Sequence, residues 1–328
     1  MSNLKQTLRA IAIALALAGC LFAGTSWSSP VASMAGGFAG GTFNDFVAGI
    51  SQALRGNPSI EAVPSPGSVE NLNRLRAGEL DMAVTFAGDA YLAFNGFDQF
   101  DDEEQPRNDI RAIGFLYSAV SQIVTLADSD IATFDNLVGK RIGVGAIGSG
   151  THLSIERLLR QAGILNDVTL VHVSGIAASE DLQAGRIDAY HVLLGTPNAT
   201  VRHTAATHDI RILDTMAAAI RAGLFDRYPF YSPVVIPSGT YRGVDADIPA
   251  FKDAGIWVVR DDLDEQLVYE MTKAVFGPAG VAVMTMVTPL AADMGPSTAL
   301  RSVAFPLHAG AARYWEEVGL QLPAAAKP

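Results

Sequence analysis

The chain has little of the chemistry that depends on cysteine or on clustered histidines. Cys20 is the only cysteine among 328 residues, so no disulfide can form within one chain. The six histidines are scattered, and the closest two, His203 and His208, are five residues apart, which is not a helical metal-ligand spacing. No serine lies in the Gly-x-Ser-x-Gly context of a hydrolase nucleophile. These absences argue against a metal site and a serine hydrolase.

Positive charge and long apolar runs are also scarce. Lysine and arginine number 23 against 34 acidic residues, and the net charge of −11 disfavours nucleic acid and anionic membrane surfaces as partners. Beyond the N-terminus, the most apolar stretch, 281–292, is interrupted by threonine and proline and is too short to span a membrane. The length predicts two domains of ordinary size with full hydrophobic cores.

The N-terminus has the pattern of an export signal. Lys5 and Arg9 precede an apolar run over 10–18, which suits a secretory signal and is shorter than the roughly 20 residues of a membrane span. The run ends in Leu-Ala-Gly-Cys at 17–20, which resembles the lipobox of bacterial lipoproteins, where the cysteine is lipidated. Alternatively, an ordinary signal peptide is cut a few residues later and Cys20 is removed with it. We assign 1–20 to the signal peptide and expect a periplasmic or other extracytoplasmic protein.

A glycine-rich turn follows an apolar strand and opens a helix within 140–159. Three glycines there have the G-x-G-x-x-G spacing of a dinucleotide-binding turn: Gly143, Gly145 and Gly148. Backbone N–H groups at such a helix start attract anions of any kind. A dinucleotide fold also needs an acidic residue about 20 residues further on. The corresponding strand, 168–174, offers only His172 and Ser174 at its end. The motif therefore indicates an anion and not NAD.

Strands and helices alternate along the chain, which predicts an α/β protein with parallel sheets covered by helices. A long strand over 114–128 is expected to supply a first crossover between two lobes, and the segment 240–255 the return. Lobe one then holds 33–127 plus 254–328, and lobe two holds 128–253. Two such units leave a cleft between them.

Three Gly/Ser/Thr junctions connect a strand to a helix, at 36–45, 65–72 and 147–153. In open α/β sheets such junctions lie at the carboxyl ends of the strands, with helix N-termini directed at the ligand. Simple helix capping is the alternative for any one of them. Three junctions of the same form in one exported chain favour ligand binding.

Seven stretches carry a family resemblance: GGTF (40–43), PGSVENLNRLRAGELDMAV (66–84), LVGKRIGVGAIGSGT (137–151), GRIDAYHVLLGTPN (185–198), YPFYSPVVIPSGTY (228–241), LVYEMTKAVF (267–276) and PLHAGAARYW (306–315). They resemble the TAXI family, the extracytoplasmic solute receptors of one branch of the tripartite ATP-independent periplasmic (TRAP) transporters. The resemblance implies a monomeric, two-lobed, type II-like periplasmic binding protein, each lobe a mostly parallel sheet flanked by helices, with the ligand in the interlobe cleft. It implies a small carboxylate ligand (glutamate, a dicarboxylate, or a keto or hydroxy acid), TRAP permease membrane subunits as partners, no cofactor and no catalysis.

Carried over residue by residue, the resemblance and the junctions give a set of expected ligand-binding residues. They are Gly41, Thr42, Phe43, Ser68, Asn71, Thr85, Phe86, Tyr117, Ser149, Gly150, Thr151, His152, Pro197, Asn198 and Tyr231. We expect Ser149, Thr151 and the amides from Gly150 onward to hold the carboxylate. The alternatives are that the hydroxyls only cap helices, that the tyrosines are core rings and that Pro197 and Asn198 form a simple turn.

The chain departs from the family pattern at positions that matter for the ligand. Phe43 and Asn44 stand where the family has two tyrosines, and Phe86 and Ala87 stand where it commonly has glutamine and serine. The phenylalanines are expected to cover an apolar part of the ligand, which is then less polar than glutamate or lacks its amino group. An exported sensor or an ABC-type receptor with the same fold is the alternative function, and an exported hydrolase is a more distant one.

Overall fold

Two long strands, β4 (Ile110–Leu126) and β10 (Ile248–Arg260), run through the middle of a single sheet. The computed structural model describes residues 31–101 and 109–328. The expected signal peptide and the lipidation of Cys20 lie outside these residues. The predicted crossover segment begins inside β4, and β10 begins inside the predicted return segment. Both strands consist largely of buried apolar residues, which suits the centre of a sheet that is covered on both faces.

The sheet is parallel toward its two ends and antiparallel at its centre. Its strand order is β2-β1-β3-β10-β4-β7-β5-β6, with β8 beside β4 and β9 beside β10. β1 runs parallel to β2 and β3, and β5 runs parallel to β6 and β7, whereas β10 is antiparallel to β3 and β4, and β4 is antiparallel to β7. The other strands are β1 (Val31–Ala35), β2 (Ser59–Val63), β3 (Met82–Phe86), β5 (Arg141–Gly143), β6 (Thr169–Val171), β7 (Ala189–Leu194), β8 (Ile210–Ile212) and β9 (Ser232–Ile236).

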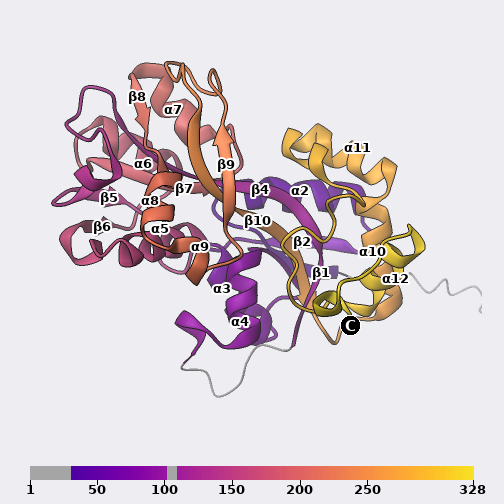
Figure 1. Cartoon of the computed structure of the whole chain (residues 1–328). Helices are drawn as coiled ribbons and strands as arrows, with labels where there is room; N and C mark the ends of the chain where they lie inside the picture. The colour runs from indigo at the N-terminus through magenta and orange to yellow at the C-terminus, as the bar shows by residue number, and fades with distance from the viewer. Residues whose placement is uncertain (1–30, 102–108) are drawn as a thin grey trace, which may run out of the picture. The chain divides into compact units, whose positions relative to one another are not determined.

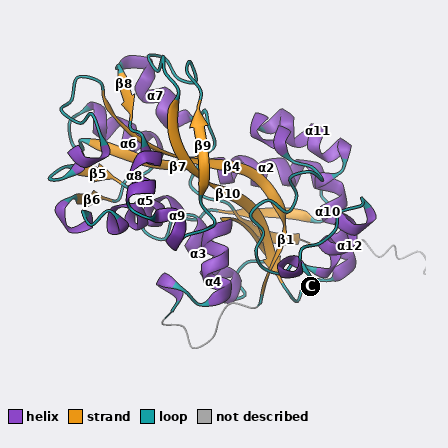
Figure 2. Cartoon of the chain, viewed as in Figure 1, coloured by secondary structure: helices purple, strands orange, loops and turns teal. Residues whose placement is uncertain are grey.

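Helices pack on the sheet between successive strands, so the predicted α/β class is confirmed (Figure 1; Figure 2). In α5, Ile155, Leu158 and Leu159 are buried, which is the apolar stripe of an amphipathic helix. The helices are α2 (Thr42–Leu54), α3 (Ser68–Arg76), α4 (Ala87–Asn95), α5 (Gly150–Gln161), α6 (Gly175–Gln183), α7 (Ala199–Thr207), α8 (Thr215–Arg221), α9 (Leu224–Arg227), α10 (Glu265–Phe276), α11 (Pro278–Val287) and α12 (Ala309–Glu317). Short 3₁₀ turns are η1 (Asp98–Phe100), η2 (Phe134–Leu137), η3 (Leu165–Asp167), η4 (Pro289–Asp293) and η5 (Ala324–Ala326).

The buried apolar residues form three clusters. The largest draws on 32–119 and 254–326, together with Leu193 from β7. The other two lie entirely within 120–251. The whole of Val31–Pro328 nevertheless groups into one compact unit. The division into a lobe of 33–127 plus 254–328 and a lobe of 128–253 stays a prediction.

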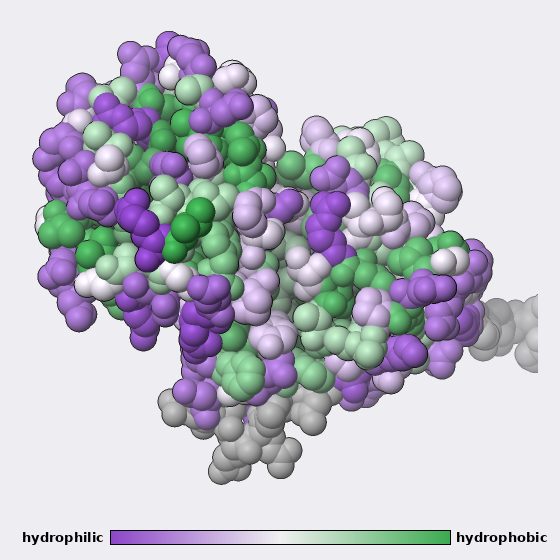
Figure 3. Space-filling model, viewed as in Figure 1, coloured by the Kyte–Doolittle hydropathy of each residue, from purple (hydrophilic) through white to green (hydrophobic). Residues whose placement is uncertain are grey.

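The surface on the face seen in Figure 3 mixes hydrophilic residues with small hydrophobic areas. Within 31–101 and 109–328, no helix has both the length and the apolar character needed to cross a bilayer. α11, which contains most of the apolar stretch noted in the sequence, has 10 residues.

Candidate ligand-binding cavity

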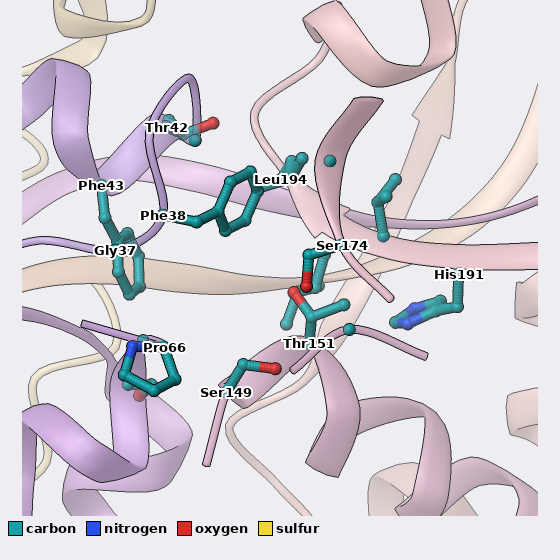
Figure 4. A pocket seen from close by; sticks show the side chains of 18 of the residues that line it. Gly37, Phe38, Thr42, Phe43, Pro66, Ser149, Thr151, Ser174, His191 and Leu194 are labelled. Carbon is teal, nitrogen blue, oxygen red and sulfur yellow. The ribbon is translucent and has the colours of Figure 1, made fainter. Parts of the chain in front are cut away.

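Four strand-to-helix junctions meet at one cavity: β1 to α2, β2 to α3, β5 to α5, and β6 to α6 (Figure 4). Its volume is about 40 Å³, which is room for about three water molecules at ~10–15 Å³ each. Many of the expected residues line it: Gly41, Thr42, Phe43, Ser68, Phe86, Ser149, Gly150 and Thr151. The three junctions identified in the sequence therefore lie together, and a fourth joins them.

Glycine conformations explain the dinucleotide-like spacing. Gly145 has φ +90°, and a Cβ there would lie 3.0 Å from the Ser149 hydroxyl and 3.2 Å from Thr151 Cγ2. Gly148 has φ +79°. Both values fall in the left-handed region that glycine adopts without steric cost. The turn thus lets the backbone fold closely around the start of α5, whatever the ligand is.

In the first turn of α5, the hydroxyl of the capping serine and the His152 amide are hydrogen-bonded to each other, whereas the amides of Gly150 and Thr151 are not used by the described residues. Ser149 Oγ accepts a 3.1 Å hydrogen bond from the His152 amide and donates a 2.7 Å bond to the Ala146 carbonyl. A hydroxyl has one proton, so Ser149 has none left for a carboxylate. The amides of Gly150 and Thr151 and the Thr151 hydroxyl have no hydrogen-bond partner in the part of the chain that the structure describes. Of the expected carboxylate donors, these three remain available, whereas the Ser149 hydroxyl is already used within the protein.

The N-terminus of α3 is occupied by the protein itself. The amides of Val69 and Glu70 donate to the Gly148 carbonyl at 3.2 and 3.1 Å. Ser68 Oγ pairs with Thr85 Oγ1 at 2.6 Å and accepts a 3.0 Å bond from the Phe86 amide. Because these groups are already paired, the second junction is a poor place for a carboxylate, although Ser68 borders the cavity.

At the N-terminus of α2, the amides of Thr42 and Phe43 have no hydrogen-bond partner among the described residues, and aromatic rings lie beside them. The capping residue of this helix, Gly41, has no side chain that could bond to the first turn. Thr42 Oγ1 accepts a 3.3 Å bond from the Gly195 amide, which links α2 to the loop after β7. The rings of Phe43 and Phe86 lie 4.7 Å apart between centroids and both line the cavity; that they cover an apolar part of the ligand stays a prediction.

The fourth junction was not among those found in the sequence. Ser174 and Gly175 begin α6 beside the cavity, and Ser174 makes no capping hydrogen bond. Gly175 has φ +60°, and a Cβ there would lie 3.0 Å from the Phe38 ring. A Ser-Gly pair between an apolar strand and a helix is the signal that could have found it.

Three of the other expected residues have hydrogen bonds within the protein instead. The Asn71 side-chain amide donates to the carbonyls of Gly36 and Val84 at 2.7 and 2.8 Å. Thr85 pairs with Ser68, as described above. His152 Nε2 lies 3.2 Å from a Glu156 carboxylate oxygen on the same helix. None of the three lines the cavity.

The remaining expected residues also lie outside the cavity lining. Asn198 caps α7 by accepting a 3.0 Å bond from the Val201 amide, and Pro197 precedes it after a cis peptide bond. Tyr231 OH accepts a 3.1 Å bond from Arg157. Tyr117 is buried, stacks on Phe46 at 5.0 Å and borders a different cavity. We do not include these residues in the site that we propose below.

His191 is the second feature that the sequence reading missed. It lies in β7, is 2% exposed, and lines the cavity between apolar neighbours. Its Nε2 is 3.1 Å from Ser121 Oγ on β4. Burial lowers the pKa of His191 to about 3, partly offset by the backbone of Thr151, so the ring is neutral at pH 7. A histidine inside the apolar strand DAYHVLLG was the available signal.

No aspartate, glutamate, lysine or arginine lines the cavity in the described ranges. The local field is set by the helix starts, each of which carries about half a positive elementary charge. Nor do three His, Cys, Asp or Glu side chains lie together as metal ligands anywhere in these ranges. The arrangement suits a small anion that is held by amides and hydroxyls.

Two larger cavities lack this arrangement. One of about 280 Å³ is lined mainly by Val120, β9 and η4, and has no converging helix N-termini. The other, of about 410 Å³, lies among charged residues of η1, α5 and α9. Neither combines apolar walls with several unpaired donors, which is the usual composition of a small-molecule site.

The chain has the α/β fold of periplasmic binding proteins. The ligand-binding component of an ABC-type import system from Staphylococcus aureus, solved with zinc bound, has a TM-score of 0.50 and 16% identity, with 91% of this chain and 97% of that chain covered. A putative L-cystine ABC transporter from Listeria monocytogenes has a TM-score of 0.48 and 12% identity, with 81% of this chain and 98% of that chain covered. The periplasmic aliphatic sulphonate binding protein of Escherichia coli has a TM-score of 0.43 and 14% identity, with 80% of this chain and 79% of that chain covered. At these identities the likeness concerns the fold alone.

The family follows from the sequence match. Residues 34–319 match the NMT1-like family, and the chain belongs to it.

Proposed function

We propose that this protein is an extracytoplasmic solute-binding receptor that captures a small organic carboxylate and delivers it to a TRAP-type membrane permease. The observation that carries the proposal is the convergence of the α2, α5 and α6 N-termini on one cavity that no charged side chain of the described residues lines. Oriented helix amides bind an anion without the desolvated cation that a buried lysine or arginine would introduce. Hydrogen bonds to a charged group contribute roughly 1.5–3 kcal/mol each.

Binding without turnover agrees with the chemistry of the lining. Among the residues that border the cavity in the described ranges, His191 is the only one with an acid-base side chain, and it is neutral. Its hydrogen-bonded neighbour Ser121 is fully buried and does not border the cavity. The Ser121–His191 pair therefore presents no nucleophile to a bound solute.

The proposal includes closure of two lobes, 33–127 plus 254–328 and 128–253, on the ligand. A carboxylate bound between α2 and α5 contacts both segments, and a ligand drives closure only through such differential contacts. The hydrogen bond from Gly195 to Thr42 and those from Val69 and Glu70 to Gly148 also connect the two segments. The family resemblance supports a periplasmic location, a monomer and a TRAP partner, with Cys20 as a possible lipid anchor.

An ABC-type receptor is the second candidate, because the solved ABC import component shares the fold over nearly its whole length. The two candidates differ in the energy source of uptake. Proteoliposomes that contain the genomically adjacent permease should accumulate the solute without ATP if it is a TRAP permease. A strict requirement for ATP hydrolysis by a neighbouring ATPase would establish the ABC assignment instead.

The ligand itself is best identified on protein purified from cells. Native mass spectrometry should show one bound organic acid of a few carbon atoms, released when the protein is unfolded and refolded. Refolded protein should then be stabilised in thermal-shift assays by small monocarboxylates. A retained ligand without a carboxylate, or no stabilisation by any carboxylate of a broad panel, would overturn the proposal.

A further inference from the structure

We propose that His191 is a specificity-determining residue and that the ligand is a small monocarboxylate with a hydroxyl or oxo group beside its carboxylate. This inference rests on the proposed function and narrows its ligand class. It uses a polar atom that the protein itself leaves unpaired.

Nδ1 of His191 is buried and has no hydrogen-bond partner in the part of the chain that the structure covers. The other ring nitrogen, Nε2, is occupied by Ser121 Oγ at 3.1 Å. Figure 4 shows the ring directed toward Thr151 and Ser174, at the starts of α5 and α6. A buried polar atom without a partner is destabilising, so such atoms need an explanation. A ligand atom in the cavity supplies the missing partner.

The position of His191 places this partner close to the carboxylate. Figure 4 shows Thr151 in front of the His191 ring, and the Thr151 amide is one of the α5 donors that have no partner among the described residues. The cavity is small, with a volume of about 40 Å³, and this favours a short chain between the two polar groups. The group that reaches Nδ1 therefore belongs to the carbon next to the carboxylate or to the one after it.

The same lining disfavours an amino group at that position. An ammonium ion there would be buried beside helix N-termini, which carry positive partial charge, with no aspartate or glutamate on the described cavity wall. A neutral imidazole can donate to an oxo group, or donate to or accept from a hydroxyl. Hydroxy and oxo acids thus satisfy both His191 and the helix amides. An amino acid satisfies the amides with its carboxylate but buries its ammonium group without a counter-charge on the described cavity wall.

The test compares four probes that share one carbon skeleton: propionate, lactate, pyruvate and alanine. Calorimetry on ligand-free wild-type protein should show lactate or pyruvate binding at least about tenfold more tightly than propionate, because one hydrogen bond contributes about 1.4 kcal/mol here. Alanine should bind more weakly than propionate. If none of the four probes or their longer homologues binds, the proposed function fails. If all four bind but lactate and pyruvate bind no more tightly than propionate, only the present inference fails.

Two substitutions test whether Nδ1 of His191 causes the tighter binding of lactate and pyruvate relative to propionate. His191→Gln can retain the contact with Ser121 but has no atom at the position of Nδ1, so the ratio of pyruvate to propionate affinity should fall toward one while propionate affinity is kept. His191→Asn places an amide near Nδ1, and it should preserve the ratio. Ser121→Ala is the matched control, because it alters the Nε2 side alone. Loss of the ratio in His191→Asn and its retention in His191→Gln would overturn the assignment.

A measurement on wild-type protein covers the case in which the variants do not fold. The ¹⁵N chemical shift of His191 Nδ1 should move when pyruvate or lactate binds and stay nearly unchanged with propionate. Equal shifts with all three acids would contradict a specific contact.

Discussion

Asp89 and Arg157 form a buried ion pair between α4 and α5. Arg157 Nη2 donates a 2.8 Å hydrogen bond to Asp89 Oδ1, and the two side chains are 6% and 1% exposed. Arg157 also donates to Tyr231 OH, and its guanidinium lies 5.8 Å from the centre of the Phe230 ring. The pair joins segments that the proposal assigns to different lobes. It is therefore expected to stabilise the closed arrangement as well as the fold.

Removing one partner of this pair should be strongly destabilising. Asp89→Asn removes the closest counter-charge of the buried Arg157 guanidinium and leaves only the Asp98 carboxylate at 3.8 Å, so we expect the free energy of unfolding in urea to fall by about 3 kcal/mol. Asp135→Asn is the control, because the Asp135–Arg221 pair is largely exposed and its loss should change stability by less than about 1 kcal/mol. Equal effects of the two substitutions would show that burial does not determine the contribution of the pair.

Gly150→Ala should destabilise the protein, although alanine has the higher helix propensity. Alanine normally stabilises a helix by about 0.5–1 kcal/mol relative to glycine. Here the added Cβ would lie 2.3 Å from a Phe86 ring carbon and 2.5 Å from Asp89 Oδ2. We expect a loss of about 1–3 kcal/mol in unfolding experiments and weaker ligand binding. The double variant with Phe86→Ala should regain part of the stability; no recovery would mean that the ring is not the obstacle.

Thr151→Val tests the hydroxyl at the start of α5. The substitution keeps the shape and removes the donor, so carboxylate affinity should fall about 10- to 100-fold in calorimetry. The unfolding midpoint of the ligand-free protein should change little, because no partner for this hydroxyl lies in the described residues. Thr285→Val, in α11 and remote from the cavity, is the control for a threonine-to-valine change. Unchanged affinity with a lowered midpoint would make Thr151 a structural residue only.

Asp253 should make stability depend on pH. Burial, together with the nearby Asp89 carboxylate, raises the pKa of Asp253 to about 8, against about 3.9 in an unfolded chain. The folded protein then binds more protons than the unfolded chain between these values, so the contribution of Asp253 to stability is lost as pH rises from about 4 to 8. The loss is at most about 1.4 kcal/mol per pH unit.

Asp253→Asn isolates this effect from that of His191, whose lowered pKa acts in the opposite direction below about pH 6.5. The asparagine can keep the oxygen that accepts from the Gly88 and Ala254 amides. Relative to wild type, its unfolding free energy should rise with pH between about 4 and 8. A difference that does not vary with pH would show that Asp253 is ionised in the folded protein.

The sequence by itself determined the alternation of strands and helices, the position of the long central strands and the location of three glycine-rich junctions. These features depend on local periodicity and on backbone conformations near glycine, which neighbouring residues specify. The rejection of a dinucleotide also needed only the strand end at 168–174, where no acidic residue occurs.

Tertiary structure alone decided which groups remain free for a ligand. Ser149 and Thr151 look alike in the sequence, but only the first has its hydroxyl proton occupied, by the Ala146 carbonyl. The amides of α3 are taken by Gly148, which lies some 80 residues away along the chain. His191 came to the cavity through the pairing of β7 with β4 and β5. Hydrogen-bond partners and burial depend on contacts between residues distant in sequence, and no local pattern encodes them.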